Sequence, residues 1–138
     1  MLEVKPSQIP NAGKGLYTTH DIKKGDVVCE YEGEKVTWKE CERRNEAQTS
    51  QGVYYFYISP KNCVDAQYTM DAKARYANDA AGFGRVPGLM NNCVYEVRKG
   101  KPYIIATRNI KAGSEILVSY GRSYWRTLAI NLKKEAEK

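Results

Sequence analysis

Short runs of β-branched and aromatic residues, each bounded by a turn signal, constrain the fold of this chain more than any other feature. The strongest run is Val53–Ile58, which reads VYYFYI and is stopped by Pro60. Val27–Tyr31 follows the turn signal Lys24-Gly25, and Glu115–Tyr120 is a further run of this kind. Runs of this composition between glycine and proline are typical of short strands. The sequence therefore predicts a mainly β protein.

A hairpin is expected between residues 93 and 107. Cys93–Arg98 and Tyr103–Thr107 are both β-rich, and the turn sequence Lys99-Gly-Lys-Pro102 separates them. Two apolar runs joined by a short glycine-containing turn are the usual signature of antiparallel neighbours.

Helices are expected to be few. Thr37 and Glu40 form a capping box, which predicts a helix from there to about Gln48. Asp71 is expected to cap a short helix that ends at Tyr76. The last residues, from Tyr124 onward, have helix-forming composition.

The length and the cysteine pattern bound the class of protein. A chain of 138 residues fits one domain with a modest core. No stretch is long and apolar enough for a membrane span, and Met1–Pro6 lacks the apolar segment of a signal peptide. The four cysteines form no CxxC pair and His20 is the single histidine, so no metal site is expected. Reduced thiols in an intracellular protein are the preferred interpretation.

The charge and the tyrosine content are the two unusual features of composition. A formal charge of +6 tolerates acidic partners and nucleic acid, although scattered lysines on a solvated surface explain it as well. The chain holds 11 tyrosines against 2 phenylalanines. Tyrosine combines an apolar ring with a polar tip, so some of these residues are expected to line a site.

Two similar segments occur far apart in the chain. Thr19–Gly25 reads THDIKKG and Thr107–Gly113 reads TRNIKAG, and each precedes an apolar strand that ends at a tyrosine, Tyr31 or Tyr120. The similarity is too short to indicate a repeat protein. It indicates either duplicated hairpins or one turn sequence used twice, and it singles out the two strand-end tyrosines.

The turn Asn11–Tyr17, which reads NAGKGLY, is not a phosphate-binding loop. It lacks the GxxxxGK[ST] and GxGxxG patterns, and strand-like residues follow it in place of a helix N-terminus. By itself such a turn indicates nothing further.

In combination, the motifs of this chain resemble those of SET-domain protein-lysine methyltransferases. The resemblance covers about residues 3 to 125, and the C-terminal segment is its most specific part. The motifs are AGKGLY (12–17), EYEGE (30–34), YYFYI (54–58), VDA (64–66), ARYAND (74–79), NNCVYEV (91–97) and IKAGSEILVSYGRSYW (110–125). The resemblance implies a β-clip of short sheets with few short helices and a threaded C-terminal segment. It implies a SET domain over residues 1–125 and a short helical tail over 126–138 without the zinc-binding motif of some relatives.

The resemblance also implies a catalytic site and a cofactor, S-adenosylmethionine. Tyr120 matches the active-site tyrosine of the family, and Tyr31 and Tyr95 match channel-lining positions, for which ordinary packing is the alternative. The positions that it assigns to cofactor binding are Ala12, Gly13, Lys14, Gly15, Tyr17, Arg75, Tyr76, Asn78, Asp79, Tyr120 and Trp125. Trp125 either stacks on the adenine or packs the final helix onto the sheet.

Three departures from the family pattern stand out. Asp79 occupies a position where the family usually has histidine, and the loop Ala80–Met90 is longer than usual. Val118 stands where some members have the Phe or Tyr that limits the number of methyl groups. Tyr95 is expected to take over that control and to favour monomethylation.

The expected function is methylation of a lysine in a protein substrate, with a histone tail as the leading candidate. A nuclear or chromatin-associated location then follows, and a homodimer or a partner protein is possible. The alternative is a degenerate SET-like module that binds chromatin or nucleic acid through its basic surface.

Overall fold

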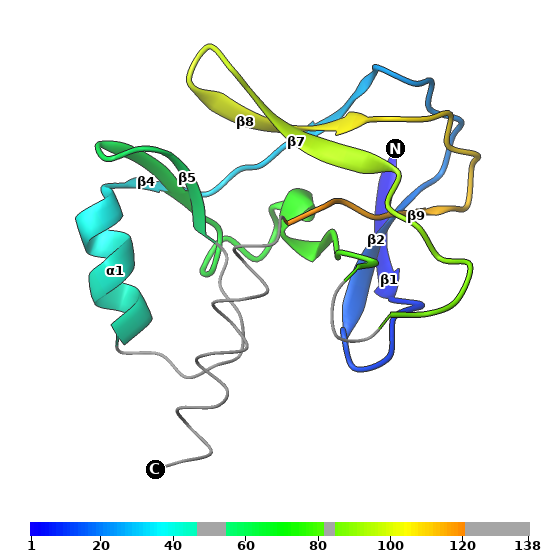
Figure 1. Cartoon of the computed structure of the whole chain (residues 1–138), viewed down its shortest axis with the longest axis horizontal. Helices are drawn as coiled ribbons and strands as arrows, with labels where there is room; N and C mark the ends of the chain where they lie inside the picture. Colours follow the sequence, from blue (N-terminus) through cyan, green and yellow to red (C-terminus); the bar gives the residue numbers. More distant parts are fainter. Residues whose placement is uncertain (47–54, 82–84, 121–138) are drawn as a thin grey trace.

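The computed structural model describes residues 1–46, 55–81 and 85–120 (Figure 1). Within these residues the chain forms three-stranded antiparallel sheets with the strand orders β1-β2-β9, β3-β8-β7 and β4-β6-β5. The strands are β1 (Leu2–Pro6), β2 (Lys14–Thr18), β3 (Val27–Glu30), β4 (Glu34–Val36), β5 (Tyr55–Ser59), β6 (Asn62–Asp65), β7 (Cys93–Arg98), β8 (Lys101–Ala106) and β9 (Glu115–Ile116). The helices are α1 (Trp38–Glu46) and the 3-10 turn η1 (Lys73–Tyr76).

The three sheets surround η1. In Figure 1 the β7–β8 hairpin runs along the top, β4 and β5 lie beside α1 on the left, and β1, β2 and β9 lie on the right. Leu16 of β2, Ile104 of β8 and Val64 of β6 belong to one buried cluster, which also contains Ala74 of η1. A single apolar core therefore joins all three sheets. This agrees with the prediction of a mainly β fold made of short sheets.

The segment after β9 lies between two distant parts of the chain. Leu117 forms a parallel bridge with Asn78, and Val118 forms one with Cys93. The Val118 amide donates to the Asn78 carbonyl at 2.8 Å, and the Cys93 amide donates to the Leu117 carbonyl at 3.0 Å. Because residues 78 and 93 are the two ends of one loop, this arrangement fits the expected threading of the C-terminal segment.

The two similar segments of the sequence pair with each other. Ile22 and Ile110 exchange both backbone hydrogen bonds at 2.8 Å. The Asp21 carboxylate accepts from the Ala112 amide, and the Asn109 side chain accepts from the Lys24 amide, both at 2.9 Å. Each segment thus makes the same contact with the other. The two segments are therefore related by a local pseudo-twofold axis, and their similarity is more than a recurring turn sequence.

Most of the expected elements are present, with one correction. The Glu40 amide donates to Thr37 Oγ1 at 3.2 Å, which confirms the predicted helix cap. The prediction that Asp71 caps the short helix is wrong, since η1 begins after Ala72 and has no side-chain cap. The expected C-terminal helix, Trp125 and the tail from residue 126 lie outside the described residues. Among the described helices, none has the length and apolar character that a membrane crossing requires.

Candidate active site

Four aromatic rings from separate parts of the chain lie in contact with one another. Tyr95 of β7 lies edge-on to Tyr31, with ring centroids 5.9 Å apart, and edge-on to Phe56 of β5 at 5.1 Å. Tyr120 stacks on Tyr95 with the ring centroids 6.4 Å apart. The structure thus brings together the three tyrosines that the sequence singled out. It adds Phe56, which the sequence placed in a strand and in the motif 54–58 but not among the expected site residues.

Tyr120 is held by the residues that follow η1. Its hydroxyl donates a hydrogen bond to the Ala77 carbonyl, and its backbone amide donates to Asp79 Oδ2 at 2.8 Å. A tyrosine hydroxyl has one proton and two lone pairs. Because the proton is directed to Ala77, the Tyr120 oxygen is set up to accept hydrogen bonds rather than to donate them.

The turn Asn11–Gly15 is connected to the same segment through Asn78. The Asn78 amide donates to the Lys14 carbonyl at 3.0 Å, while the Asn78 carbonyl accepts from Val118. The turn is closed by a bond from the Ser7 amide to the Gly13 carbonyl at 2.9 Å. Asn78 therefore connects the glycine turn to the chain segment that ends at Tyr120.

A buried carboxylate lies beneath the turn. Glu115, which is 2% exposed, accepts hydrogen bonds from the Ser7 hydroxyl at 2.6 Å and from the Gln8 amide at 3.0 Å. A Cβ on Gly15 would lie 2.3 Å from Glu115 Oε2. Gly15 is therefore required by the packing of Glu115, whereas Gly13 has φ +71° and open space around it. No motif of the sequence had identified Glu115 as a site residue.

Three of the expected cofactor-binding side chains have structural contacts. The Tyr17 hydroxyl donates to the Pro6 carbonyl at 2.8 Å, and burial, with Glu115 nearby, raises the pKa of Tyr17. The Tyr76 hydroxyl donates to the Met70 carbonyl at 2.8 Å. The Arg75 guanidinium donates to the carbonyls of residues 66 and 67. These side chains fix the loops that surround the candidate site.

Asp79 is turned into the protein. It is 4% exposed, and its Oδ1 accepts from the Ala81 amide and from the Asn91 side chain, both at 2.8 Å. The Asn91 side chain in turn accepts from the Ala80 amide at 2.8 Å. The departure from the usual histidine is thus accompanied by an asparagine partner from the other end of the long loop.

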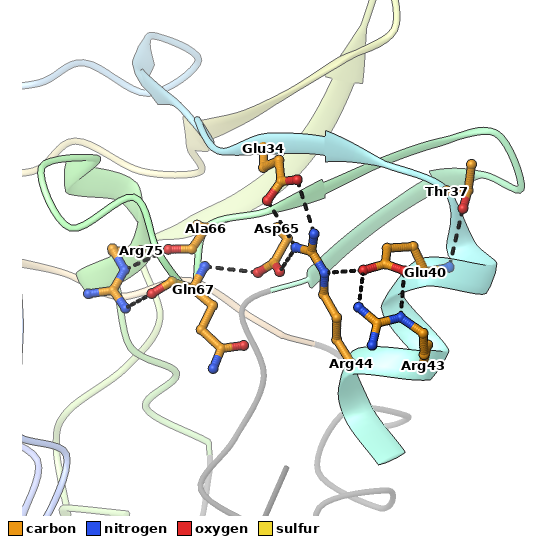
Figure 2. A network of polar contacts seen from close by, with 9 residues as sticks. All are labelled: Glu34, Thr37, Glu40, Arg43, Arg44, Asp65, Ala66, Gln67 and Arg75. Atoms are coloured by element: carbon orange, nitrogen blue, oxygen red, sulfur yellow. Dashed lines mark hydrogen bonds and ion pairs between the residues drawn. The ribbon is translucent and has the colours of Figure 1, made fainter. Parts of the chain in front are cut away.

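An ion network fixes the sheet that carries Phe56. Arg44 reaches from α1 to Glu34 of β4 at 3.0 Å and to Asp65 of β6 at 2.7 Å, and it also contacts Glu40 (Figure 2). The Asp65 side chain is 0% exposed, so Arg44 provides the charge partner of a buried carboxylate. The network positions one edge of the aromatic cluster through β5 and β6.

The glycine turn leaves room for a ligand at the place where S-adenosylmethionine is expected. The turn 12–14 exposes backbone atoms beside open space at Gly13, and Asn78 joins it to the segment that carries Tyr120. Glycine with positive φ allows a ligand to approach the backbone closely. Trp125, expected near the adenine, lies outside the described residues.

Comparisons with known proteins agree with this arrangement. The SET domain family model matches residues 13–121. Histone-lysine N-methyltransferase SUV39H2 of Xenopus tropicalis is 32% identical over 121 residues, covering 78% of this chain and 27% of that protein. N-lysine methyltransferase KMT5A-A of Danio rerio is 31% identical over 123 residues, covering 82% and 33%. Histone-lysine N-methyltransferase Su(var)3-9 of Drosophila pseudoobscura pseudoobscura is 29% identical over 125 residues, covering 81% and 19%.

The chain spans between 19% and 33% of the length of these relatives, which corresponds to one part of each. The family match covers most of the present chain, including the glycine turn from Gly13, the aromatic cluster and Tyr120. The chain belongs to the SET-domain family.

Proposed function

We propose that this chain is an S-adenosylmethionine-dependent protein-lysine N-methyltransferase. The observation that carries the proposal is the position of Tyr120, which stacks on Tyr95 at 6.4 Å while its hydroxyl is directed to the Ala77 carbonyl. The proposal is supported by an acceptor oxygen beside a group of aromatic rings, whose partner Ala77 precedes the residue that bonds to the glycine turn, Asn78. When bound, S-adenosylmethionine supplies an electrophilic methyl group on a sulfonium.

The chemistry requires a neutral lysine amine, whose pKa in water is about 10.4. The rings of Tyr31, Phe56 and Tyr95 offer an environment with little water, which disfavours the ammonium and lowers the lysine pKa. The Tyr120 oxygen accepts a hydrogen bond from the amine and thereby directs its lone pair. Orientation of the reacting atoms supplies much of the remaining rate enhancement.

The glycine turn is the proposed holder of the cofactor. Backbone atoms of Ala12, Gly13 and Lys14 bind its methionine end, and Asn78 keeps the turn in register with Tyr120 through its bond to the Lys14 carbonyl. Five further residues support the surrounding loops through packing and hydrogen bonds: Gly15, Tyr17, Arg75, Tyr76 and Asp79.

A histone tail is the proposed substrate. Two of the relatives described above carry the name histone-lysine N-methyltransferase. If a histone is the substrate, the protein works in association with chromatin. We expect the tail to bind as an extended peptide along the edge of a strand.

Tyr95 is proposed to limit the product to monomethyl-lysine. Its ring stacks on Tyr120, and Val118, which is 0% exposed, leaves no bulky side chain at the position that has this role in some relatives. The Tyr95 hydroxyl would retain a water in the space that a second methyl group needs. Tyr95→Phe is expected to raise the ratio of dimethyl to monomethyl product, measured by mass spectrometry of a lysine peptide. An unchanged ratio would remove Tyr95 from this role.

The function is tested by incubating the chain with radiolabelled S-adenosylmethionine and a panel of core histones and other abundant basic proteins. The expected result is label on a lysine of at least one histone. A parallel thermal unfolding experiment measures whether the cofactor raises the melting temperature, because a ligand of the folded state stabilises it. No transferred label together with no thermal shift at saturating cofactor would instead favour a non-enzymatic binding module.

A further inference from the structure

We propose that the Asp79 carboxylate, clamped by Asn91, positions Tyr120 for the reaction. Asp79 acts through the backbone of Tyr120 and does not itself touch the reacting atoms. This inference rests on the proposed function. Asp79 and Asn91 keep Tyr120 in position, so that its hydroxyl accepts a hydrogen bond from the substrate amine.

Three consecutive residues hold the segment that ends at Tyr120. The Ala77 carbonyl accepts from the Tyr120 hydroxyl, and the Asn78 carbonyl accepts from the Val118 amide. The Asp79 carboxylate then accepts from the Tyr120 amide at 2.8 Å. Residues 77–79 thus fix Tyr120 at both its hydroxyl and its backbone amide.

The carboxylate is itself fixed at both oxygens. Oδ1 accepts from the Ala81 amide and from the Asn91 side chain, and Oδ2 accepts from the Tyr120 amide, each at 2.8 Å. Asn91 is oriented by the Ala80 amide, which donates to its Oδ1 at 2.8 Å. Hydrogen bonds to an ionised, buried carboxylate are stronger than those between neutral groups. Asp79 therefore connects Tyr120 to Ala81, near the start of the loop 80–90, and to Asn91, directly after it.

The residue types connect two of the three departures from the family pattern, Asp79 and the long loop 80–90. Within the described parts of the chain, three donors meet at Asp79, and an ionised carboxylate can accept all of them. A neutral imidazole offers a single acceptor nitrogen and could not replace it here. Asn91, which follows the long loop, donates to this carboxylate, so Asn91 and Asp79 act together.

The proposal is tested with Asp79→Asn, Asn91→Asp and the double variant. Asp79→Asn replaces one acceptor by a donor and is expected to lower kcat about 100-fold, because small displacements of a reacting group have effects of this size. The KM for S-adenosylmethionine is expected to change much less. Asn91→Asp places two carboxylates side by side and is expected to be similarly impaired. The double variant restores a carboxylate–amide pair and is expected to recover about tenfold of the lost kcat, the worth of roughly one hydrogen bond.

Amide hydrogen exchange in the cofactor-free protein provides a readout that does not depend on activity. The Tyr120 amide is expected to exchange at least about tenfold faster in Asp79→Asn, because it loses its carboxylate acceptor. The amide of Ile104, in the buried strand β8, is expected to keep its protection. Asp26→Asn is the matched control, since Asp26 is an exposed aspartate that accepts from a backbone amide at a distance from the site.

Unchanged kcat and unchanged Tyr120 exchange in Asp79→Asn would overturn the proposal. Equal loss of protection at Tyr120 and Ile104 would also overturn it, because that result identifies a general role in folding. If Asp79→Asn does not fold, Asn91→Ala keeps the carboxylate, removes one donor, and is expected to show smaller changes in both readouts. If the wild-type chain transfers no methyl group to any lysine, the proposed function fails, while the exchange experiment still tests the hold of Asp79 on Tyr120.

Discussion

The packing of the Glu115 side chain explains why residue 15 is a glycine. The sequence suggested that both glycines of the turn allow a cofactor to approach, but a Cβ at position 15 would lie 2.3 Å from Glu115 Oε2 and 3.1 Å from the Ser7 Cβ. Glu115 cannot move away easily, because Ser7 and Gln8 hold its carboxylate. Gly13 has open space and a positive φ, so only its backbone conformation restricts the residue type.

Gly15→Ala is expected to destabilise the protein by about 3 kcal/mol, the upper range for an overpacked site. Gly13→Ala is expected to cost about 1 kcal/mol, because only the positive φ opposes it. Urea unfolding of both variants measures the difference. In a Glu115→Ala background the carboxylate is gone, so Gly15→Ala should cost clearly less. Equal costs in both backgrounds would show that Glu115 is not the reason for the glycine.

The thiols are expected to react slowly in the folded protein. Burial raises the pKa of Cys41 and of Cys93 to about 12, and burial together with the nearby Glu32 does the same for Cys29. A higher thiol pKa leaves less thiolate at a given pH, and the thiolate is the reactive form. At pH 8 the disulfide reagent DTNB should modify these three residues more than about 1000-fold more slowly than in the urea-unfolded chain, in proportion to the loss of thiolate. Reaction of any of them at the unfolded rate would contradict the assignment.

At the scale of elements, Arg44 is the link between α1 and the sheet of β4, β5 and β6. Figure 2 shows its guanidinium between Glu34, Asp65 and Glu40. Its hydrogen bonds to Glu34, Glu40 and Asp65 raise the pKa of Arg44 above its ordinary value, and those from Arg43 and Arg44 lower the pKa of Glu40 to about 2. The link matters for the site because Phe56 of β5 belongs to the aromatic cluster.

Arg44→Met is expected to destabilise the protein by about 3 kcal/mol, because it leaves the fully buried Asp65 without a cation. Arg43→Met is the matched control, since Arg43 is largely exposed and pairs with Glu40 at the surface. Surface pairs of this kind contribute little, so no measurable change is expected. Urea unfolding followed by circular dichroism measures both. Equal stability of the two variants would contradict the role of Arg44.

The strands that could be predicted are those with strong β composition. The runs at 27–31 and 93–98 correspond to β3 and β7, because valine and tyrosine dominate them. β1, β4 and β6 were not predicted. β1 contains Pro6 and two charged residues, β4 has three residues, and β6 begins with Asn62 and ends with Asp65. Such strands form because they pair with neighbours, which no local pattern reveals.

At the scale of the whole molecule, the sequence predicted which tyrosines meet but not what holds them. Tyr31, Tyr95 and Tyr120 were chosen through the family resemblance, and their rings do lie together. The supporting residues come from distant parts of the chain, as in the contact between Glu115 and Ser7. Long-range partners of this kind depend on three-dimensional packing. The sequence contained indirect signals of some of them, such as the unusual Asp79 and the similarity of residues 19–25 to residues 107–113.

The pairing of Thr19–Gly25 with Thr107–Gly113 connects two of the sheets. Ile22, which precedes β3, pairs with Ile110, which precedes β9, so the segments that lead into these two sheets are joined. From there the segment after β9 runs towards η1, as the orange trace in Figure 1 shows. The last described residue of this segment is Tyr120. The position of the candidate catalytic tyrosine is therefore a property of the entire fold.

The initial rate of methyl transfer to a histone substrate, compared between the wild-type chain and Tyr120→Phe, tests the central claim most directly. Loss of the hydroxyl that orients the amine is expected to reduce the rate about 100-fold. Tyr103→Phe, which changes a tyrosine of β8 outside the aromatic cluster, is expected to keep the wild-type rate. A Tyr120→Phe variant that transfers methyl groups as fast as the wild-type chain would contradict the account.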